Sequence, residues 1–244
     1  MYRMRLSLPK GQEAKYRNLD LLHDALVEAW GAAGASSEDV VGRYARPWNF
    51  AALGIHRDGG NLVHTLVIST PDRELANHLT HFDPGRVRYG RTHTAEAVDF
   101  ARANVLPDPD PIAPGQTALG VVMLSPLVIS REDHKDSKRH WHNNVDGFDL
   151  SAAVNKRLSR IVGRPTALNL HPDHLYLRIQ PRHDTLVPIK ESRDGKRGFV
   201  VGMLFPLVLR GCDEDLRLAW YAGIGEKNRN GFGTIGLAEK GIGR

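Results

Sequence analysis

The stretch Gly223-Ile224-Gly225-Glu226-Lys227-Asn228-Arg229-Asn230-Gly231-Phe232-Gly233 decides how the rest of the chain is interpreted. It joins a helix-like segment, residues 216–221, to a short apolar tail, residues 234–237. Glycine permits positive φ angles and close approach of another chain. A loop with exposed backbone N–H groups and two cations suits a phosphate backbone. The loop is not a mononucleotide P-loop, because the Gly-Lys-Ser/Thr order is missing and the loop follows a helix instead of opening one.

Composition predicts one large domain or two of moderate size with an anionic partner. The chain has 244 residues, of which 41% are hydrophobic, and its formal net charge is +5 with a pI near 9.4. Nucleic acid is the first candidate for the partner, and a merely basic protein is the alternative. The single cysteine, Cys212, excludes an intramolecular disulfide, and no Cys-rich zinc pattern occurs. With neither a signal peptide nor a run of about 18 apolar residues, a cytoplasmic protein without membrane contact is expected.

Hydrophobic patterns in the first half predict one ferredoxin-like unit. Asn18 is the predicted N-cap of the first helix. The order is strand, helix, strands, helix, strand, as in a ferredoxin-like unit. The predicted strands are 2–8, 39–45, 50–56, 62–69 and 86–91, the helices are 19–30 and 72–81, and a hairpin turn is expected at 58–61.

The second half repeats this theme after an irregular segment. A helix is predicted over 95–104, but the proline-rich residues 107–111 fit neither a helix nor a central strand, so a domain boundary is expected there. Further strands are predicted at 119–129, 174–179, 186–190 and 199–209, and helices at 146–162 and 216–221. The predicted fold class is therefore α+β, with two tandem ferredoxin-like (RRM-like) domains and a central cleft. The domains would span 1–91 and 117–244, with 92–116 as an insertion or linker.

Several segments resemble the CRISPR repeat-RNA processing endoribonucleases, which belong to a wider superfamily of repeat-associated RNA-binding proteins. The Gly-Ile-Gly-Glu-Lys…Gly-Phe-Gly loop is similar to the glycine-rich loop of that family, and so is its lead-in, residues 198–209 and 215–221. Leu22-His23-Asp24-Ala25-Leu26 is similar to the Leu-His-x-x-Leu context in which several members carry a catalytic histidine. The resemblance implies tandem ferredoxin-like domains that bind a CRISPR repeat RNA stem-loop and cleave it.

His23 is the candidate acid/base of that cleavage. It lies four residues after Leu19 and three before Leu26, at the border of an apolar stripe, which by itself is typical of a structural histidine at the edge of a core. The resemblance implies instead that His23 takes a proton from a ribose 2′-hydroxyl or gives one to the leaving 5′-oxygen. The products would be a 2′,3′-cyclic phosphate and a 5′-hydroxyl. Because the substrate carries its own nucleophile, no metal and no other cofactor is expected.

Two further residues are catalytic candidates. Lys227 would stabilise the charge of the pentacoordinate phosphorane, and Tyr44 would orient the 2′-hydroxyl or stack on a base. Solvated loops with surface cations are the alternative. No recognised metal-ligand spacing occurs among the histidines. The predicted RNA-binding residues lie near Tyr44, in a basic segment, on one helix face, on a hairpin and in the glycine loop: Arg43, Arg46, Lys138, Arg139, Lys156, Arg157, Arg160, Arg193, Lys196, Arg197, Gly223, Gly225, Arg229, Gly231 and Gly233.

The resemblance thus implies a metal-independent endoribonuclease that cuts CRISPR precursor RNA within the repeat, and the family often stays bound to the mature guide RNA. Other subunits of a CRISPR effector complex are further partners that the resemblance implies. The alternative is a non-catalytic subunit that grips the guide RNA in such a complex, and removal of His23 distinguishes the two. A ferredoxin-like enzyme acting on a small acidic metabolite is a third hypothesis, which salt-sensitive binding of a repeat hairpin would contradict.

Overall fold

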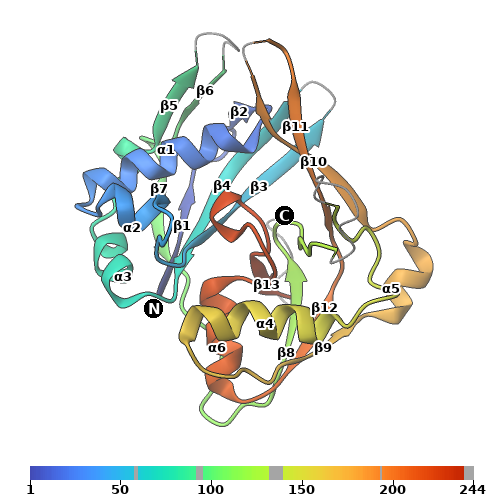
Figure 1. Ribbon diagram of the computed structural model, residues 1–244. Coiled ribbons are helices and arrows are strands. Elements are labelled where there is room, and N and C mark those ends of the chain that lie inside the picture. Colours follow the sequence, from blue (N-terminus) through green and yellow to red (C-terminus); the bar gives the residue numbers. More distant parts are fainter. Residues whose placement is uncertain (58–59, 92–95, 132–139, 193, 239–244) are drawn as a thin grey trace. The chain divides into compact units, whose positions relative to one another are not determined.

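The computed structural model describes residues 1–57, 60–91, 96–131, 140–192 and 194–238 (Figure 1). The chain forms two compact units, each of mixed helix and sheet. The first comprises Met1–Pro109, Pro188–Phe199 and Arg229–Gly231. The second comprises Asp110–Val187, Val200–Asn228 and Phe232–Arg244. Each unit therefore draws on more than one part of the sequence.

The first unit has the strand order of a ferredoxin-like domain. β1 (Tyr2–Ser7) lies between β7 (Asn104–Pro107) and β4 (Gly60–Thr70), and β3 (Asn49–Arg57) pairs with β4. All these pairs are antiparallel. Because helices follow β1 and β4, the unit has the predicted alternation of strands and helices.

The helices of the first unit bury one apolar stripe each. α1 (Leu19–Ala32) runs across the sheet in Figure 1 and buries Leu22, Leu26 and Trp30. Burying a side chain of this size stabilises a fold by about 1.5–3 kcal/mol. α3 (Arg73–Thr80) begins after Asp72, whose carboxylate accepts hydrogen bonds from the amides of Glu74 and Leu75. Both helices were predicted, and both are confirmed.

Three predictions for the first unit are wrong. The predicted strand 39–45 contains the end of a helix, α2 (Ser37–Val41), which is capped by the Ser36 hydroxyl accepting from the Asp39 amide. The predicted helix 95–104 contains β6 (Glu96–Asp99), which pairs with β5 (Arg88–Arg91). The segment 86–91 is therefore not the last strand of the ferredoxin-like order, because β7 takes that place beside β1.

Two small elements complete this unit. β2 (Ala14–Tyr16) was not predicted and joins β6 to β4, and η1 (Pro84–Arg86) precedes β5. Pro107 ends β7 at the edge of the sheet, as expected for a residue that cannot donate to a ladder. The predicted turn at 58–61 includes residues 58–59, which lie outside the described part of the chain.

The second unit has the same strand order. β8 (Ala118–Met123) lies between β13 (Ile235–Leu237) and β12 (Leu207–Arg210), and β9 (Asn169–Pro172) pairs with the other edge of β12. These pairs are antiparallel. α4 (Leu150–Val162) and α6 (Asp213–Ala222) supply the two helices, which pack on a shared core that includes Val121, Val154 and Leu216.

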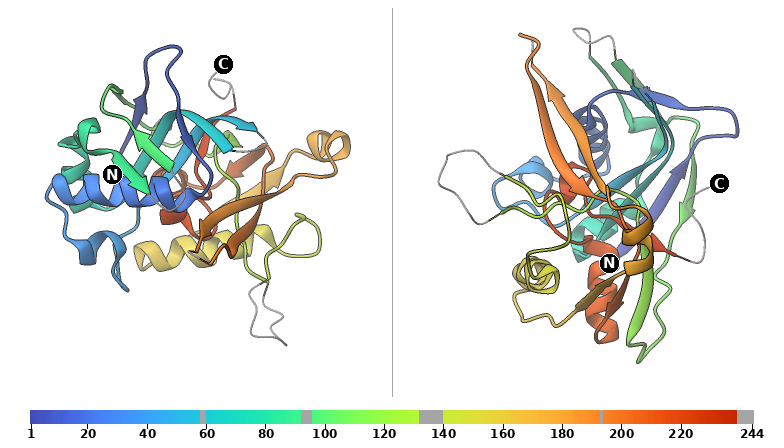
Figure 2. Two further views of the ribbon diagram at one scale, coloured as in Figure 1. Left: turned by 90° about the horizontal axis from the view of Figure 1, so that it is seen from above. Right: turned by 90° about the vertical axis from the view of Figure 1, so that its right-hand side faces the viewer.

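One strand prediction in this half fails because of local capping, and a second holds in part, because the strand is interrupted around a proline where an edge or a bulge is expected. Residues 174–179 form a short helix, α5 (His174–Ile179). Its N-cap is Asp173, whose side chain accepts hydrogen bonds from two backbone amides. The predicted strand 199–209 is divided into β11 (Arg197–Met203) and β12, with Pro206 in the break. β10 (Asp184–Glu191) pairs with β11, and the two run side by side as a ribbon in Figure 2. The glycine loop contains η2 (Asn228–Asn230).

No helix in the described ranges is long and apolar enough to cross a membrane. Over the same ranges, no group of three or more His, Cys, Asp or Glu side chains is placed to hold a metal ion.

Candidate functional site

The imidazole of His23 is held in a defined orientation on α1. Its side chain is 19% exposed, and its Nδ1 lies 3.2 Å from Oδ1 of Asp24. The ring stacks on Trp48, with ring centroids 5.8 Å apart and planes inclined by 21°. Among the described residues no hydrogen bond to Nε2 is found, so this nitrogen is available to a substrate.

Asp24 is an ionised partner for this imidazole. Desolvation raises its pKa, but hydrogen bonds with His23 and Arg91 outweigh that effect and hold the pKa below its ordinary value. Arg91 also pairs with Asp20 at 2.7 Å, and desolvation raises the pKa of Asp20. A carboxylate only accepts, so Nδ1 of His23 carries the proton. Nε2 is then an acceptor in the neutral ring and a donor in the imidazolium.

The tip of the glycine loop lies in the same unit as His23. Nη1 of Arg229 is 3.4 Å from the carbonyl oxygen of Val40 and 3.5 Å from that of Gly42. Nε1 of Trp48 donates to the same Val40 oxygen at 3.0 Å. The His23 ring, Trp48 and Arg229 are therefore connected by successive contacts. Burial lowers the pKa of Arg229, but a guanidinium is not deprotonated in proteins, so the side chain stays cationic.

Gly231 permits the close approach of this tip to α1 and β3. Its φ is +86°, and a Cβ at this position would meet Cζ of Phe50 at 2.8 Å and Cδ2 of Leu19 at 3.3 Å. Phe50 in turn stacks on Trp48 with centroids 6.0 Å apart. A side chain at position 231 would therefore displace the aromatic group that supports His23.

Internal hydrogen bonds brace the part of the loop that lies in the second unit. Nδ2 of the buried Asn228 donates to the carbonyl oxygens of Ile224 at 3.3 Å and Phe232 at 3.1 Å. The amides of Ile224, Glu226 and Gly233 donate to backbone carbonyls. The expectation that the loop exposes its N–H groups is therefore wrong for these three. The four loop glycines are buried, so they determine the shape of the loop: Gly223, Gly225, Gly231 and Gly233.

Lys227 and Glu226 lie in the second unit. Lys227 has a positive φ of 57°, and its Nζ is 6.0 Å from the centroid of Trp141. The Glu226 carboxylate accepts from the amide of Ser130 at 3.0 Å and from its hydroxyl at 2.6 Å. These contacts fix the loop beside the segment that follows β8.

The three residues predicted around Tyr44 have different surroundings. Tyr44 is 82% exposed, and the Arg43 guanidinium lies 5.5 Å from its ring centroid. Arg46 pairs with Asp39 at 2.7 Å, Asp72 at 3.2 Å and Glu74 at 2.6 Å. Hydrogen bonds, with that to Asp39 the strongest, raise the pKa of Arg46. Arg46 therefore serves an internal ion-pair cluster, which the sequence did not reveal because two of the acids lie more than 20 residues away.

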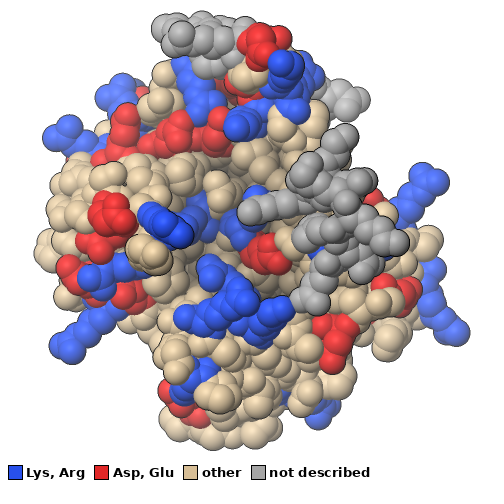
Figure 3. All heavy atoms as spheres, viewed as in Figure 1, with Lys and Arg blue, Asp and Glu red and all other residues tan. Residues whose placement is uncertain are grey.

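The predicted basic face of α4 lines a cavity of about 330 Å³ in the second unit. Lys156, Arg157 and Arg160 form one wall, and Arg131 and Glu226 lie on the others. Figure 3 shows Lys and Arg side chains gathered over α4. The structure thus brings three predicted RNA-binding residues of α4 to the same cavity as a residue of the glycine loop.

The remaining predicted residues lie on or near the β10–β11 hairpin or outside the described residues. Nζ of Lys196 is 2.9 Å from Asp194, and Arg197 is 3.4 Å from Glu191. The tight turn at Asp194 and Gly195 is confirmed by a hydrogen bond from the Gly195 amide to the Ser192 carbonyl. The predictions for three residues fall outside the described part of the chain: Lys138, Arg139 and Arg193.

The chain was compared with protein families and with proteins of known sequence or structure. Residues 108–237, more than half of the chain, match the family model described as "CRISPR associated protein Cas6, C-terminal". No curated protein sequence matches the chain.

Solved structures share the fold at low sequence identity. The structure described as "Characterization of a Cas6-related gene from Pyrococcus furiosus" is 15% identical, with a TM-score of 0.70, over 98% of this chain and 99% of that one. One described as "CRISPR associated protein Cas6" is 16% identical, with a TM-score of 0.65, over 97% and 99%. One described as "An RAMP protein binding different RNA substrates" is 14% identical, with a TM-score of 0.63, over 97% and 99%. The predicted resemblance and the tandem ferredoxin-like fold are confirmed, and the chain belongs to the Cas6 family of CRISPR-associated proteins.

Proposed function

We propose that this protein is an endoribonuclease that cuts CRISPR precursor RNA within its repeat. Family membership and the fold support an RNA-processing role. The observation that carries the proposal is the His23 imidazole, whose Nδ1 is occupied by an ionised Asp24 and whose Nε2 has no partner among the described residues. A histidine held in this way can transfer a proton at one defined atom.

In the proposed reaction the ribose 2′-oxygen attacks the adjacent phosphorus, and the bond to the 5′-oxygen breaks. The products are a 2′,3′-cyclic phosphate and a 5′-hydroxyl. Nε2 of His23 takes the proton of the 2′-hydroxyl or gives a proton to the leaving oxygen, and solvent water takes part in the other of these two transfers. Asp24 stabilises the imidazolium. Arg229, in contact with Val40 beside Trp48, or Lys227 offsets the added negative charge of the phosphorane. Exposed Tyr44 orients the 2′-hydroxyl or stacks on a base.

The reaction is proposed to proceed without a metal ion, because the nucleophile is part of the substrate. A histidine side chain can also transfer the protons without help from a metal. The basic wall of α4 and the hairpin cations are proposed to hold the RNA backbone. A solved relative of the same fold is described as binding different RNA substrates. We also propose that these cationic surfaces keep the product, the guide RNA, bound after cleavage. A larger CRISPR effector complex is the further proposed partner.

The first test removes the imidazole. The purified protein is incubated with end-labelled repeat RNA in buffer containing EDTA, and the wild type should make a single cut. His23→Ala should lower the single-turnover rate by about 10²–10⁴-fold, because it removes a general acid or base. Its dissociation constant for the RNA should change by less than about threefold, since the cationic surfaces are unaltered.

His81→Ala is the matched control. His81 is exposed just beyond α3 in the same unit, and its Nδ1 is 2.9 Å from the Asn77 carbonyl oxygen. This variant should cut at the wild-type rate. Tight RNA binding without any cut by the wild type, with or without EDTA, would instead favour a non-catalytic subunit that grips the guide RNA.

A further inference from the structure

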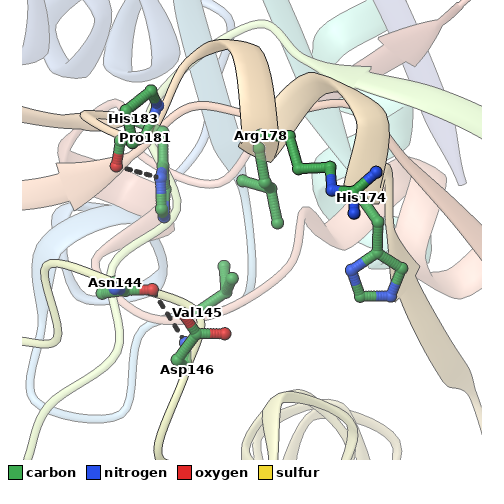
Figure 4. Close-up of a pocket in the computed structure, with 8 residues that line it drawn as sticks. Asn144, Val145, Asp146, His174, Arg178, Pro181 and His183 are labelled. Atoms are coloured by element: carbon green, nitrogen blue, oxygen red, sulfur yellow. Dashed lines mark hydrogen bonds between the residues drawn. The ribbon is translucent and has the colours of Figure 1, made fainter.

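A second cavity, of about 510 Å³, lies in the second unit between α5 and residues 144–146. None of its lining residues belongs to the candidate site around His23. Figure 4 shows His183 and Asn144 on facing sides of this cavity, with Arg178 and His174 on the α5 side. All the lining residues that the structure describes belong to the second unit.

His183 is the most informative residue of this cavity. It is 6% exposed, its Nδ1 is 3.2 Å from the Pro181 carbonyl oxygen, and its ring meets Phe205 edge-on. Because a carbonyl only accepts, Nδ1 carries the proton and Nε2 is the acceptor of the neutral ring. Nε2 is buried and has no hydrogen-bond partner among the described residues. Leaving such a nitrogen unpaired costs free energy, so a donor placed there by a ligand would be stabilising.

The other walls combine apolar and polar surfaces. Leu177, Val145 and Pro181 supply apolar contact. Asn144 Oδ1 accepts from the Asp146 amide at 2.9 Å, which orients the Asn144 side chain and leaves its NH₂ group to donate. Arg178 is exposed on the α5 side and adds a positive charge. Apolar contact, hydrogen-bonding groups and a cation around one cavity match a base, its polar edge and its phosphate.

We propose that this cavity binds one unpaired nucleotide of the RNA. The base enters between Leu177 and Val145 and donates an N–H to Nε2 of His183, the Asn144 amide bonds the base edge, and Arg178 binds the adjacent phosphate. A cavity of this volume accommodates a base with its ribose. The inference rests on the proposed function and extends it, because the second unit would then select RNA by an extruded nucleotide as well as by backbone charge.

The first experiment measures the affinity of the wild type for a fluorescein-labelled repeat RNA in which each nucleotide in turn is replaced by an abasic residue. One position should weaken binding about tenfold, as expected for loss of one bound base. In the double variant Asn144→Ala/Arg178→Ala, binding of the intact RNA should weaken by about the same factor. The same abasic replacement should then have less than a twofold further effect, because non-additivity identifies groups in contact.

The matched control is Asn143→Ala/Arg182→Ala, which makes the same chemical changes at exposed neighbours that do not line the cavity. It should bind intact RNA within twofold of the wild type and keep the full abasic effect. Both variants change exposed side chains, so the folded state should persist. If every abasic position weakens the wild type and the Asn144→Ala/Arg178→Ala variant equally, the proposal is overturned.

The second experiment does not depend on cleavage or on the repeat. The wild type is titrated with the four nucleoside 5′-monophosphates, and the histidine ring signals are followed by NMR. At least one nucleotide should shift the His183 ring signals in the wild type. The Asn144→Ala/Arg178→Ala variant should require at least a fivefold higher concentration of that nucleotide for the same shift. Such shifts in a protein that neither binds nor cuts repeat RNA would retain the pocket and reject the proposed function. Cleavage of repeat RNA with no His183 shift and no non-additive abasic position would reject the pocket alone.

Discussion

Asp24 links the proposed chemistry to the stability of the first unit. It contacts His23 on one side and Arg91 on the other, and Arg91 also pairs with Asp20. The same carboxylate therefore orients the imidazole and takes part in an ion-pair cluster. Its two roles can be separated, because one affects the rate of cleavage and the other affects unfolding.

The effect on cleavage is tested with Asp24→Asn. The amide keeps the shape of the side chain but removes the charge that fixes the protonated Nδ1 and stabilises the imidazolium. We expect the single-turnover rate to fall by at least about tenfold with little change in RNA affinity. Asp99→Asn is the control, because Asp99 pairs with Arg88 at 3.1 Å in the same unit and has no contact with His23. Equal rates for the two variants would contradict the role of Asp24.

The effect on unfolding follows from the sign of the pKa shift. The pKa of Asp24 is lowered in the folded protein, so its ionisation stabilises the fold above the unfolded value of about 3.9. That contribution is lost as the pH falls through the folded pKa. Urea unfolding should therefore show a difference in unfolding free energy between wild type and Asp24→Asn that is constant from pH 7 to 5 and shrinks below pH 4. A difference that grows in acid would contradict the assignment.

At this scale the sequence identified His23 as a candidate but not the residues that orient it. The motif Leu22-His23-Asp24 carries the histidine, whereas Arg91 lies 67 residues beyond Asp24 and enters through the β5–β6 hairpin. The ion pairs of Arg46 were missed for the same reason. Contacts between charges remote in sequence depend on the pairing of strands, which a one-dimensional pattern does not contain.

Helices and long strands were predictable because their burial is periodic. α1 and α4 follow a 3.6-residue apolar repeat, and β1 and β4 have the length and apolar content of buried strands. Three short elements were not predictable: in α2 and α5 a capping side chain decides the conformation, and in β2 pairing with neighbours decides it. The exposed edge strand β7 also carries no strong pattern, because none of its four residues is buried.

The glycine loop gives a stability prediction at the scale of an element. Gly233 has a φ of +73°, and a Cβ there would lie 1.9 Å from the Ile224 carbonyl oxygen. Gly115 has a φ of +74° but nothing within 4 Å of the added atom. Gly115→Ala should therefore cost only the backbone strain, about 1 kcal/mol, whereas Gly233→Ala should cost more than about 3 kcal/mol. Urea unfolding of both variants measures the difference, and equal costs would mean that the loop rearranges without penalty.

For the molecule as a whole, the location of the positive charges says more about the binding surface than the net charge does. The net charge of +5 predicts an anionic partner, but many cations are neutralised internally, as in the cluster around Arg46 and the pair of Arg164 with Asp215. The basic wall of α4 lines a cavity. Composition predicted only an anionic partner with nucleic acid as the first candidate, whereas the surface that is proposed to bind it depended on the fold.

The salt dependence of binding tests this surface. Replacing Lys156, Arg157 and Arg160 with alanine should reduce the slope of log K against log salt by about 2–3, since each phosphate contact contributes about 0.7–0.9. The control replaces Arg86, Arg88 and Arg102, which are exposed in the first unit, and removes the same charge. Its slope should change by less than one. Similar slopes for both triple variants would indicate a general charge effect rather than a binding surface at α4.

The first unit takes Arg229–Gly231 from near the end of the chain, and Gly231 lies against Phe50 and Leu19. A gene fragment that stops after codon 109 would therefore encode a first unit with an unfilled gap beside these two side chains. Recombination between related genes at the proline-rich segment would combine the first part of one protein with the glycine-loop tip of another. These two parts would not have been selected for contact with each other. Inheritance of this protein as one undivided reading frame thus preserves a fit between its beginning and its end.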